Sequence, residues 1–317
     1  MRSSSPYIGR FAPSPTGPLH MGSLATALGS FLDARLHHGQ WLLRIEDIDA
    51  ERCDQQSVEH ILHTLRRHGL NWDGEALVQS TRHALYQQAL DQLDAADLVF
   101  PCACTRKDIE QANAHRAFGE NRIYPGTCSL GMPKGKKARA IRFRCPAEAV
   151  KWSDWHAGDQ LEHLPSSSGD FVLKRGDGFW AYHLAVVVDD RASEVTHIVR
   201  GEDLLDTTAR QVALWSALNA NDRAEDNVAA PSYWHLPVIL APDGQKLSKQ
   251  TGALAVPECS PTTNLNVVWK HFGMPPIQAD NVDSWLRTAT SLWVRVRQQF
   301  YQTGCGRNTL TKASPIN

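Results

Sequence analysis

Residues 7–23 read YIGRFAPSPTGPLHMGS, and this stretch decides the fold. The apolar run at its start predicts a short strand, which three prolines and a glycine then break. Apolar residues recur at helical spacing from Leu24 to Leu32, and Gly39 supplies a stop. A helix that begins after a strand presents free backbone N–H groups to a phosphate. His20 and Ser23 add donors there, so the stretch predicts a phosphate site.

A second run, KLSKQ at residues 246–250, follows a Pro-Asp-Gly turn signal. It places Lys246 and Lys249 three residues apart on a predicted loop. Either run alone is compatible with an ordinary turn. Together, in this order and far apart in the chain, they favour two groups of donors that hold one triphosphate from both ends.

The two runs resemble the HIGH and KMSKS signatures of class I aminoacyl-tRNA synthetases. In the first signature Met21 and Ser23 replace Ile and His. In the second, Leu247 and Gln250 replace Met and Ser. Residues 10–14 and the run RIEDID at residues 44–49 resemble the glutamyl branch. The resemblance extends from about residue 7 to about residue 250, and it implies an α/β fold: a Rossmann-like, parallel-sheet catalytic domain.

The composition is that of an ordinary globular protein, with 42% of the 317 residues hydrophobic and 21% charged. The formal net charge of −1 argues against broad electrostatic capture of nucleic acid, although a small basic patch remains compatible with it. The chain lacks an apolar run of about eighteen residues, so we expect no membrane-spanning helix. Its first six residues contain no apolar stretch, so we expect no signal peptide. Its seven cysteines, an odd number, argue against a disulfide framework. We expect a monomer in a reducing cytoplasm, without membrane contact.

Strand and helix signals alternate along the chain, which is typical of a parallel sheet with crossover helices. Such sheets bind ligands at the carboxyl ends of their strands. Predicted strands cover residues 41–45, 140–144, 179–188 and 195–200, and predicted helices lie around residues 58–65, 86–93, 208–218, 267–272 and 282–300. We divide the chain into the first half of a nucleotide-binding catalytic domain (1–100), an insertion with a zinc site (101–190), the second half of that domain (191–255) and a small helical C-terminal subdomain (256–317).

The length of the chain bears on its function, because only 67 of the 317 residues follow Gln250. Glutamyl-tRNA synthetases carry a large helical anticodon-binding region after the lysine motif, so the chain resembles the truncated paralogues without it. These paralogues activate L-glutamate with ATP and transfer it from glutamyl-adenylate to the queuosine base in the anticodon of tRNA(Asp). The alternatives are the catalytic subunit of a conventional glutamyl-tRNA synthetase and a non-catalytic, zinc-stabilised RNA-binding module.

The resemblance also implies which residues handle ATP. His20, Lys246 and Lys249 are expected to be catalytic, because charge accumulates on phosphate oxygens during attack on the α-phosphate. Gly22 and Ser23 are expected to join them in the ATP site. Mg²⁺ is expected to accompany the nucleotide, because phosphate oxygens favour a hard cation.

Glutamate carries two carboxylates and one ammonium group, so its site needs two cationic partners and one anionic partner. The resemblance places Arg10 and Arg200 on the carboxylates. It places Tyr182 near the side-chain carboxylate and Glu46 on the ammonium group. From the residues alone, Arg200 fits a surface salt bridge, Tyr182 fits the core, and Glu46 fits a surface charge or a pair with Arg44. The other expected members of the glutamate site are Phe11, Ala12, Pro13 and Ser14.

A cysteine cluster predicts a structural zinc site. Cys102, Cys104 and Cys128 offer three thiolates close in sequence, which is typical of a tetrahedral zinc centre. In the family the tyrosine four residues before the last cysteine completes the set, and Tyr124 stands there; His115 is the rival from ligand chemistry. The alternative is a set of buried, metal-free thiols. The isolated cysteines are interpreted as inert: Cys53, Cys145, Cys259 and Cys305.

Two other charged runs are interpreted as structural features rather than as functional sites. Asp189 and Asp190 follow a predicted strand and are interpreted as a turn rather than as catalytic groups. The basic run Lys134–Arg139 fits a solvated loop, although it would also suit RNA phosphates. Most of the ten tryptophans are expected in the core, and single ones cannot be assigned to base stacking.

Overall fold

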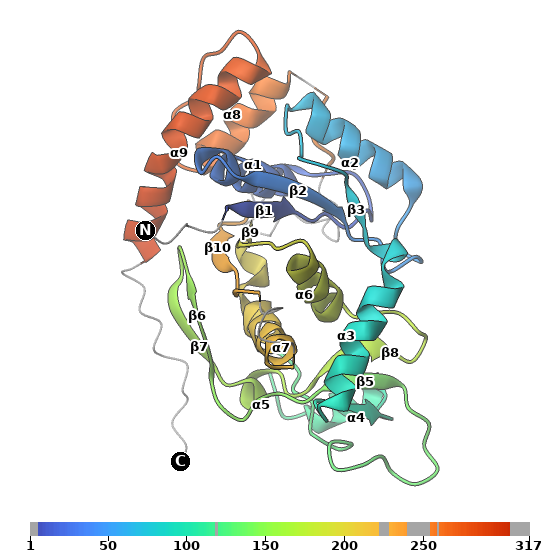
Figure 1. Ribbon diagram of the computed structural model, residues 1–317. Helices are drawn as coiled ribbons and strands as arrows, with labels where there is room; N and C mark the ends of the chain where they lie inside the picture. The colour runs from blue at the N-terminus through green and yellow to red at the C-terminus, as the bar shows by residue number, and fades with distance from the viewer. Residues whose placement is uncertain (1–5, 118–119, 222–227, 240–253, 259, 305–317) are drawn as a thin grey trace.

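A seven-stranded sheet forms the centre of the computed structural model, which describes residues 6–117, 120–221, 228–239, 254–258 and 260–304 (Figure 1). Its strand order is β3-β2-β1-β9-β10-β6-β7, and every neighbouring pair is parallel except β6 and β7. The strands are β1 (Ile8–Phe11), β2 (Gln40–Ile45), β3 (Leu77–Val78), β6 (Val150–Asp154), β7 (Gly158–Glu162), β9 (His197–Gly201) and β10 (Ser232–Leu236). This arrangement confirms the predicted parallel α/β fold.

Helices cover both faces of this sheet. In Figure 1, α1, α8 and α9 lie above it, and α6 and α7 lie below it. The α-helices of the main body are α1 (Met21–Leu36), α2 (Gln55–Arg67), α3 (His83–Ala95), α6 (Tyr182–Ala192), α7 (Thr208–Ala220), α8 (Pro261–His271) and α9 (Val282–Gly304). Two 3-10 helices precede α3 and α7 in this body: η1 (Gln79–Thr81) and η2 (Glu202–Thr207). All six predicted helices are present, including the one predicted from Leu24 to Leu32.

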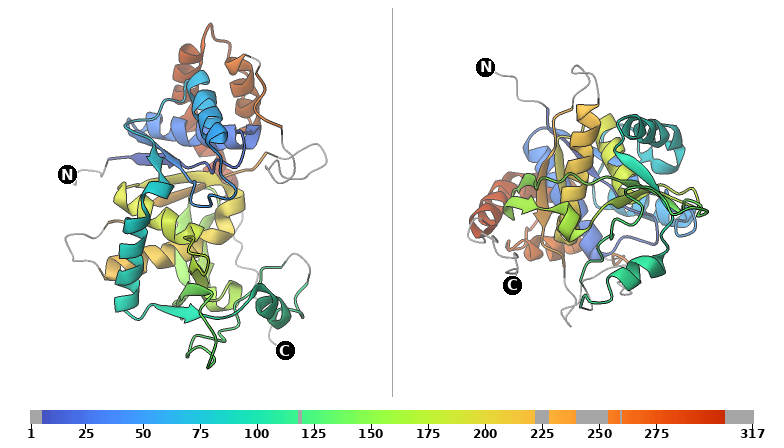
Figure 2. Two further views of the ribbon diagram at one scale, coloured as in Figure 1. Left: turned by 90° about the vertical axis from the view of Figure 1, so that its right-hand side faces the viewer. Right: turned by 90° about the horizontal axis from the view of Figure 1, so that it is seen from below.

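A small antiparallel sheet carries the cysteine cluster. It has the order β4-β5-β8, with β4 (Val99–Cys102), β5 (Ala140–Phe143) and β8 (Phe171–Arg175), and two short helices flank it, α4 (Arg106–Ala112) and α5 (Leu164–Ser167). Figure 2 shows this region at the end of the molecule remote from α8 and α9. The hairpin β6–β7 lies within the same stretch of sequence but joins the main sheet beside β10. The proposed domain boundaries stay a prediction.

The strand predicted over residues 179–188 is wrong, because residues 182–192 form helix α6. Residues 184–190 are all buried and residues 184–188 are all apolar, so the run lacks the periodicity that separates a helix from a strand. The turn predicted at Asp189 and Asp190 is wrong for the same reason. Both carboxylates lie in the last turns of α6 and are at most 1% exposed.

Large aromatic side chains fill the core between α1, α8 and α9. Trp41, Trp269, Trp285 and Trp293 are fully buried there, and the Trp293 ring contacts both Trp269 and Phe272. A second cluster lies between α3, α6 and α7. Most tryptophans are therefore core residues, as predicted. Within the described parts of the chain, none of the helices combines the length and apolarity that a bilayer crossing requires.

Trp293 on α9 provides a test of this packing. Trp293→Ala is expected to lower the free energy of unfolding by about 3–5 kcal/mol, because it opens a cavity and removes an indole that donates to Asp33. Val294→Ala, at an exposed position on the same helix, is the matched control, with an expected change within about 0.5 kcal/mol. Urea unfolding followed by circular dichroism measures both, and equal effects would contradict a packed α1–α9 interface.

Candidate active site

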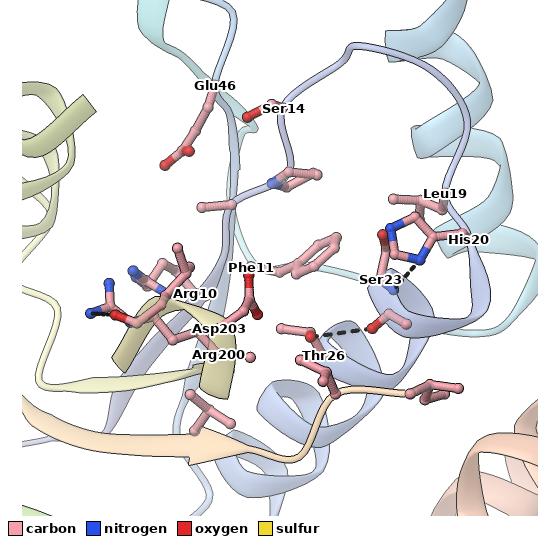
Figure 3. Close-up of a pocket in the computed structure, with 18 of the residues that line it drawn as sticks. Arg10, Phe11, Ser14, Leu19, His20, Ser23, Thr26, Glu46, Arg200 and Asp203 are labelled. Carbon is pink, nitrogen blue, oxygen red and sulfur yellow. Dashed lines mark hydrogen bonds between the residues drawn. The ribbon is translucent and has the colours of Figure 1, made fainter. Parts of the chain in front are cut away.

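A cavity of about 260 Å³ opens at the carboxyl ends of β1, β9 and β10. It is lined by every described residue that the sequence predicted for glutamate and ATP: Arg10, Phe11, Ala12, Pro13, Ser14, His20, Gly22, Ser23, Glu46, Tyr182 and Arg200. Figure 3 shows His20 and Ser23 on one side of the pocket and Arg10 and Arg200 on the other. Lys246 and Lys249 lie outside the described residues.

His20 is the N-cap residue of α1. Its extended backbone (φ −105°, ψ 172°) starts the helix, and its Nδ1 accepts a hydrogen bond from the Ser23 backbone N–H at 3.2 Å. Because Nδ1 accepts there, a neutral His20 ring carries its proton on Nε2. The ring therefore offers an N–H donor to an anion, together with the partial positive charge of the helix start.

The segment with the two lysines is bounded by residues that lie at this pocket. Ile239, which precedes it, lines the cavity. After it, Ala255 forms a bridge with His20, and the Val256 backbone N–H donates to the Leu19 carbonyl at 2.8 Å. The chain after the lysine run is therefore attached to the start of α1, and the chain before it reaches the cavity wall.

A buried ionic network holds two of the predicted glutamate-binding residues. Arg10 donates to Asp190 through Nε at 3.1 Å and Nη2 at 3.3 Å. Arg44 donates to the same carboxylate at 2.5 Å and to Glu46 at 3.0 Å. Burial raises the pKa of Asp190, but Arg10 and Arg44 outweigh it, so the pKa lies below its usual range. These charged groups thereby join β1 and β2 to α6.

Glu46 lies at the edge of this network and lines the cavity. Burial raises its pKa above the usual value, although Arg44 and Arg10 oppose the shift. Glu46 is only 8% exposed, so the alternative of a surface charge is wrong. The alternative of a pair with Arg44 is confirmed.

Asp189 extends the network from α6 to η1 and α3. Its carboxylate accepts from Arg82 at 2.7 Å, from the Gln79 amide at 2.7 Å and from the Tyr86 hydroxyl at 2.8 Å. Burial first, and then the negative charge of Asp189, raise the pKa of Tyr86, which keeps the phenol protonated as a donor. Helix α6 is thus fixed to η1 and α3 at the residue next to Asp190.

Arg200 has a different environment, because it is buried at 3% exposure yet contacts uncharged acceptors. Its Nε donates to His235 Nε2 at 2.9 Å, Nη1 donates to Gln211 Oε1 at 2.7 Å, and Nη2 donates to Thr208 Oγ1 at 2.8 Å. The surface salt bridge considered for Arg200 is therefore wrong. Tyr182, half-buried beside it, also lines the cavity, and burial raises its phenol pKa.

Sequence reasoning missed the groups that support Arg10 and Arg200. Asp190 was interpreted as part of a turn, and Gln211 and His235 were not singled out. The signal for His235 was a histidine inside an apolar strand, with sequence SYWHL. A polar side chain at such a position is buried and requires a partner.

The three predicted cysteines come together beside the small sheet. The Sγ atoms of Cys102, Cys104 and Cys128 lie within 4.8 Å of one another. The Tyr124 hydroxyl lies 3.5 Å from Cys102 Sγ and accepts from the Cys128 backbone N–H at 2.8 Å. His115 is exposed and does not belong to this thiol cluster. The cluster is compatible with a zinc site.

Comparison with known proteins assigns the chain to a known class. Residues 8–261 match the family model described as tRNA synthetases class I (E and Q), catalytic domain. A glutamyl-Q tRNA(Asp) synthetase of Janthinobacterium sp. (strain Marseille) is 47% identical over 91% of this chain and 97% of its own length. The protein of the same name from Cupriavidus metallidurans is 48% identical, over 92% of each chain. The chain therefore belongs to the glutamyl-Q tRNA(Asp) synthetase family.

Two solved structures have a similar fold. The glutamate-tRNA synthetase of Elizabethkingia anophelis has a TM-score of 0.73 and 27% identity, over 89% of this chain. A glutamate tRNA ligase from Elizabethkingia meningosepticum, solved in complex with its amino acid, has a TM-score of 0.72 and 28% identity. The present chain spans 65% and 64% of these two structures.

Asp190 provides a test of the buried network. Asp190→Asn removes the negative charge between Arg10 and Arg44, and breaking a buried pair costs about 3–5 kcal/mol of unfolding free energy. Asp177→Asn, whose partner Arg175 is exposed, is the control and should cost less than about 1 kcal/mol. Denaturant unfolding of both variants measures the difference, and a near-neutral Asp190→Asn would show that the network is not needed for stability.

Proposed function

We propose that this chain activates L-glutamate with ATP and transfers it to the queuosine base in the anticodon of tRNA(Asp). One observation carries the proposal: a single cavity gathers two buried guanidinium groups, a carboxylate and a helix start with a histidine donor. These are the groups that an amino acid with two carboxylates and a nucleotide phosphate together require. The named relatives, which are 46–48% identical, support the identity of the acceptor.

In the first step, a glutamate carboxylate oxygen attacks the α-phosphorus of ATP, and pyrophosphate leaves with its electron pair. Arg10 and Arg200 would hold the carboxylates, with Tyr182 near the side-chain carboxylate, while Glu46 would accept from the ammonium group. The Nε2–H of His20 would donate to the α-phosphate oxygens as charge develops there. Lys246 and Lys249 would neutralise the departing pyrophosphate, and Mg²⁺ would accompany ATP.

In the second step, a ring hydroxyl of queuosine attacks the carbonyl carbon of the mixed anhydride. The new bond is an ester, AMP leaves, and the hydroxyl proton is lost. The anticodon base must be splayed out of its loop to reach the pocket, which is the usual state of an RNA base recognised in a single strand. We further propose that the enzyme acts as a monomer, in the cytoplasm where its tRNA is found.

The cysteine cluster would hold one structural zinc ion. Zinc–sulfur bonds of about 2.3 Å in a tetrahedron place two sulfur atoms about 3.8 Å apart. The Sγ atoms of Cys104 and Cys128 are 3.8 Å apart, so these residues fit the ion. Cys102 and the Tyr124 oxygen would complete the set. The ion would cross-link β4 to the loop that precedes β5, and we assign it no part in the reaction.

The acceptor is tested by charging three purified tRNAs with radiolabelled glutamate. We expect label on tRNA(Asp) that carries queuosine, and none on unmodified tRNA(Asp) or on tRNA(Glu). Digestion with a base-specific ribonuclease should place the label in the anticodon fragment, and mild alkali should release it as expected of an ester. Label at the 3′-terminal adenosine of tRNA(Glu) would instead assign the chain as a conventional synthetase.

The metal is tested by elemental analysis of the purified protein. Wild type is expected to hold about one zinc per chain, and Cys104→Ser is expected to lose it. Cys145→Ser is the matched control, because this thiol lies outside the cluster and donates to the Gly169 carbonyl. Tyr124→Phe and His115→Ala decide the fourth ligand, and we expect weaker zinc retention only in the first. Full occupancy in Cys104→Ser would contradict this ligand set.

A further inference from the structure

Behind Arg200 lies a buried relay that the proposed reaction does not explain. His235 on β10 pairs with Arg200 on β9 in the sheet register, so the two side chains are direct neighbours. The His235 Nδ1 lies 2.6 Å from Asp154 Oδ2, and its Nε2 lies 2.9 Å from Arg200 Nε. All three residues are at most 4% exposed. An imidazole therefore connects a buried carboxylate to the guanidinium.

The direction of these hydrogen bonds fixes the protonation of His235. A guanidinium nitrogen only donates, so His235 Nε2 must accept from Arg200. The ring proton is then on Nδ1, which donates to Asp154, and the imidazole is neutral. Burial lowers the pKa of His235 below its usual value, although Asp154 opposes the shift, and this direction is consistent with a neutral ring.

Asp154 is itself held in one orientation. Its Oδ1 accepts from the backbone N–H groups of His156 and Ala157 at 3.0 and 2.8 Å. Its Oδ2 accepts from the His235 backbone N–H at 3.1 Å as well as from the ring. These four hydrogen bonds fix the orientation of the carboxylate. Its Oδ2 therefore accepts from His235 Nδ1, which keeps the ring proton on that nitrogen.

The consequence for Arg200 is electrostatic. Among the described residues, its hydrogen-bond acceptors are the neutral ring of His235, the Gln211 amide, the Thr208 hydroxyl and the Leu204 carbonyl. A carboxylate in direct contact would orient the guanidinium but would also satisfy its charge. Here the carboxylate of Asp154 lies one side chain away, behind the imidazole.

We propose that Asp154 and His235 are positioning residues that hold the Arg200 guanidinium in place while leaving its charge available to a substrate carboxylate. This inference rests on the proposed function, because it takes glutamate as the substrate. Arg10 contrasts with Arg200 in this respect, since Asp190 contacts it directly. Protonation of His235 would place a second N–H against the guanidinium and break the contact. The charged or titratable groups that face His235 are Asp154 from β6, Arg200 from β9, Asp203 from η2 and Tyr233 from its own strand.

The test uses the kinetics of glutamate-dependent ATP–pyrophosphate exchange. His235→Phe keeps a planar ring but removes the acceptor, and it is expected to raise the KM for glutamate about tenfold, the effect of one lost hydrogen bond to a charged group. The KM for ATP should stay within about twofold, because His20 and the helix start are untouched. His235→Gln retains an acceptor oxygen and should recover part of the affinity.

Asp154→Asn gives an independent arm. If the new NH₂ group takes the place of Oδ1, it faces the backbone N–H groups of His156 and Ala157, which are also donors. If it takes the place of Oδ2, it faces the His235 backbone N–H and requires the ring proton of His235 to move to Nε2. The KM for glutamate should rise in this variant as well. His197→Phe is the matched control: this histidine is on β9, stacks on Tyr7 at 3.9 Å and does not line the cavity, so both KM values should be unchanged.

The outcomes separate the two proposals. Wild-type protein that shows no glutamate-dependent exchange would overturn the proposed function. Wild-type exchange together with an unchanged glutamate KM in folded His235→Phe would overturn the relay alone. A purely structural role would lower the fraction of active enzyme, measured by a burst of adenylate formation, and would leave the glutamate KM unaltered. Such a result in both His235→Phe and Asp154→Asn would also overturn the relay.

Discussion

The Asp190 carboxylate, shared by two buried guanidinium groups, is the interaction on which the pocket depends. It joins Arg10 of β1 and Arg44 of β2 to the end of α6. A buried ion pair adds little net stability compared with an apolar contact, but removing one partner leaves the other charge buried and uncompensated. The network therefore acts as a constraint: α6 can take one position against the sheet, and this places Tyr182, at its start, on the cavity wall.

The two arginines of the pocket are held in different ways. Arg10 contacts a carboxylate directly, so much of its charge is balanced before any ligand arrives. Arg200 is held by uncharged acceptors among the described residues, and its balancing carboxylate is behind His235. Electrostatic interactions are strong in a buried, weakly polarisable site. Two carboxylates of one substrate would thus meet two guanidinium groups of unequal residual charge.

The sequence predicted the class of fold and the position of the pocket, because these follow from local signals. The strand, the proline-rich loop and the helix start at residues 8–21 lie where the pattern put them. The strand predicted over residues 179–188 failed because a run buried on all sides has no period. Asp190 and His235 were missed because their partners are distant: Arg10 is 180 residues from Asp190, and Asp154 is 81 residues from His235. Pairing at such separations is decided by topology, not by spacing.

Helix α9 packs against α1 although it lies beyond residue 261, where the match to the family model ends. Its Trp293 donates to Asp33 of α1 at 3.0 Å, and its Arg297 contacts the same oxygen. The other oxygen of Asp33 accepts from the Tyr7 hydroxyl at 2.6 Å, beside β1. One buried carboxylate therefore fixes α1 against both the sheet and α9. Because His20 caps α1, the helix that these contacts fix is also the one that brings the His20 imidazole to the cavity wall.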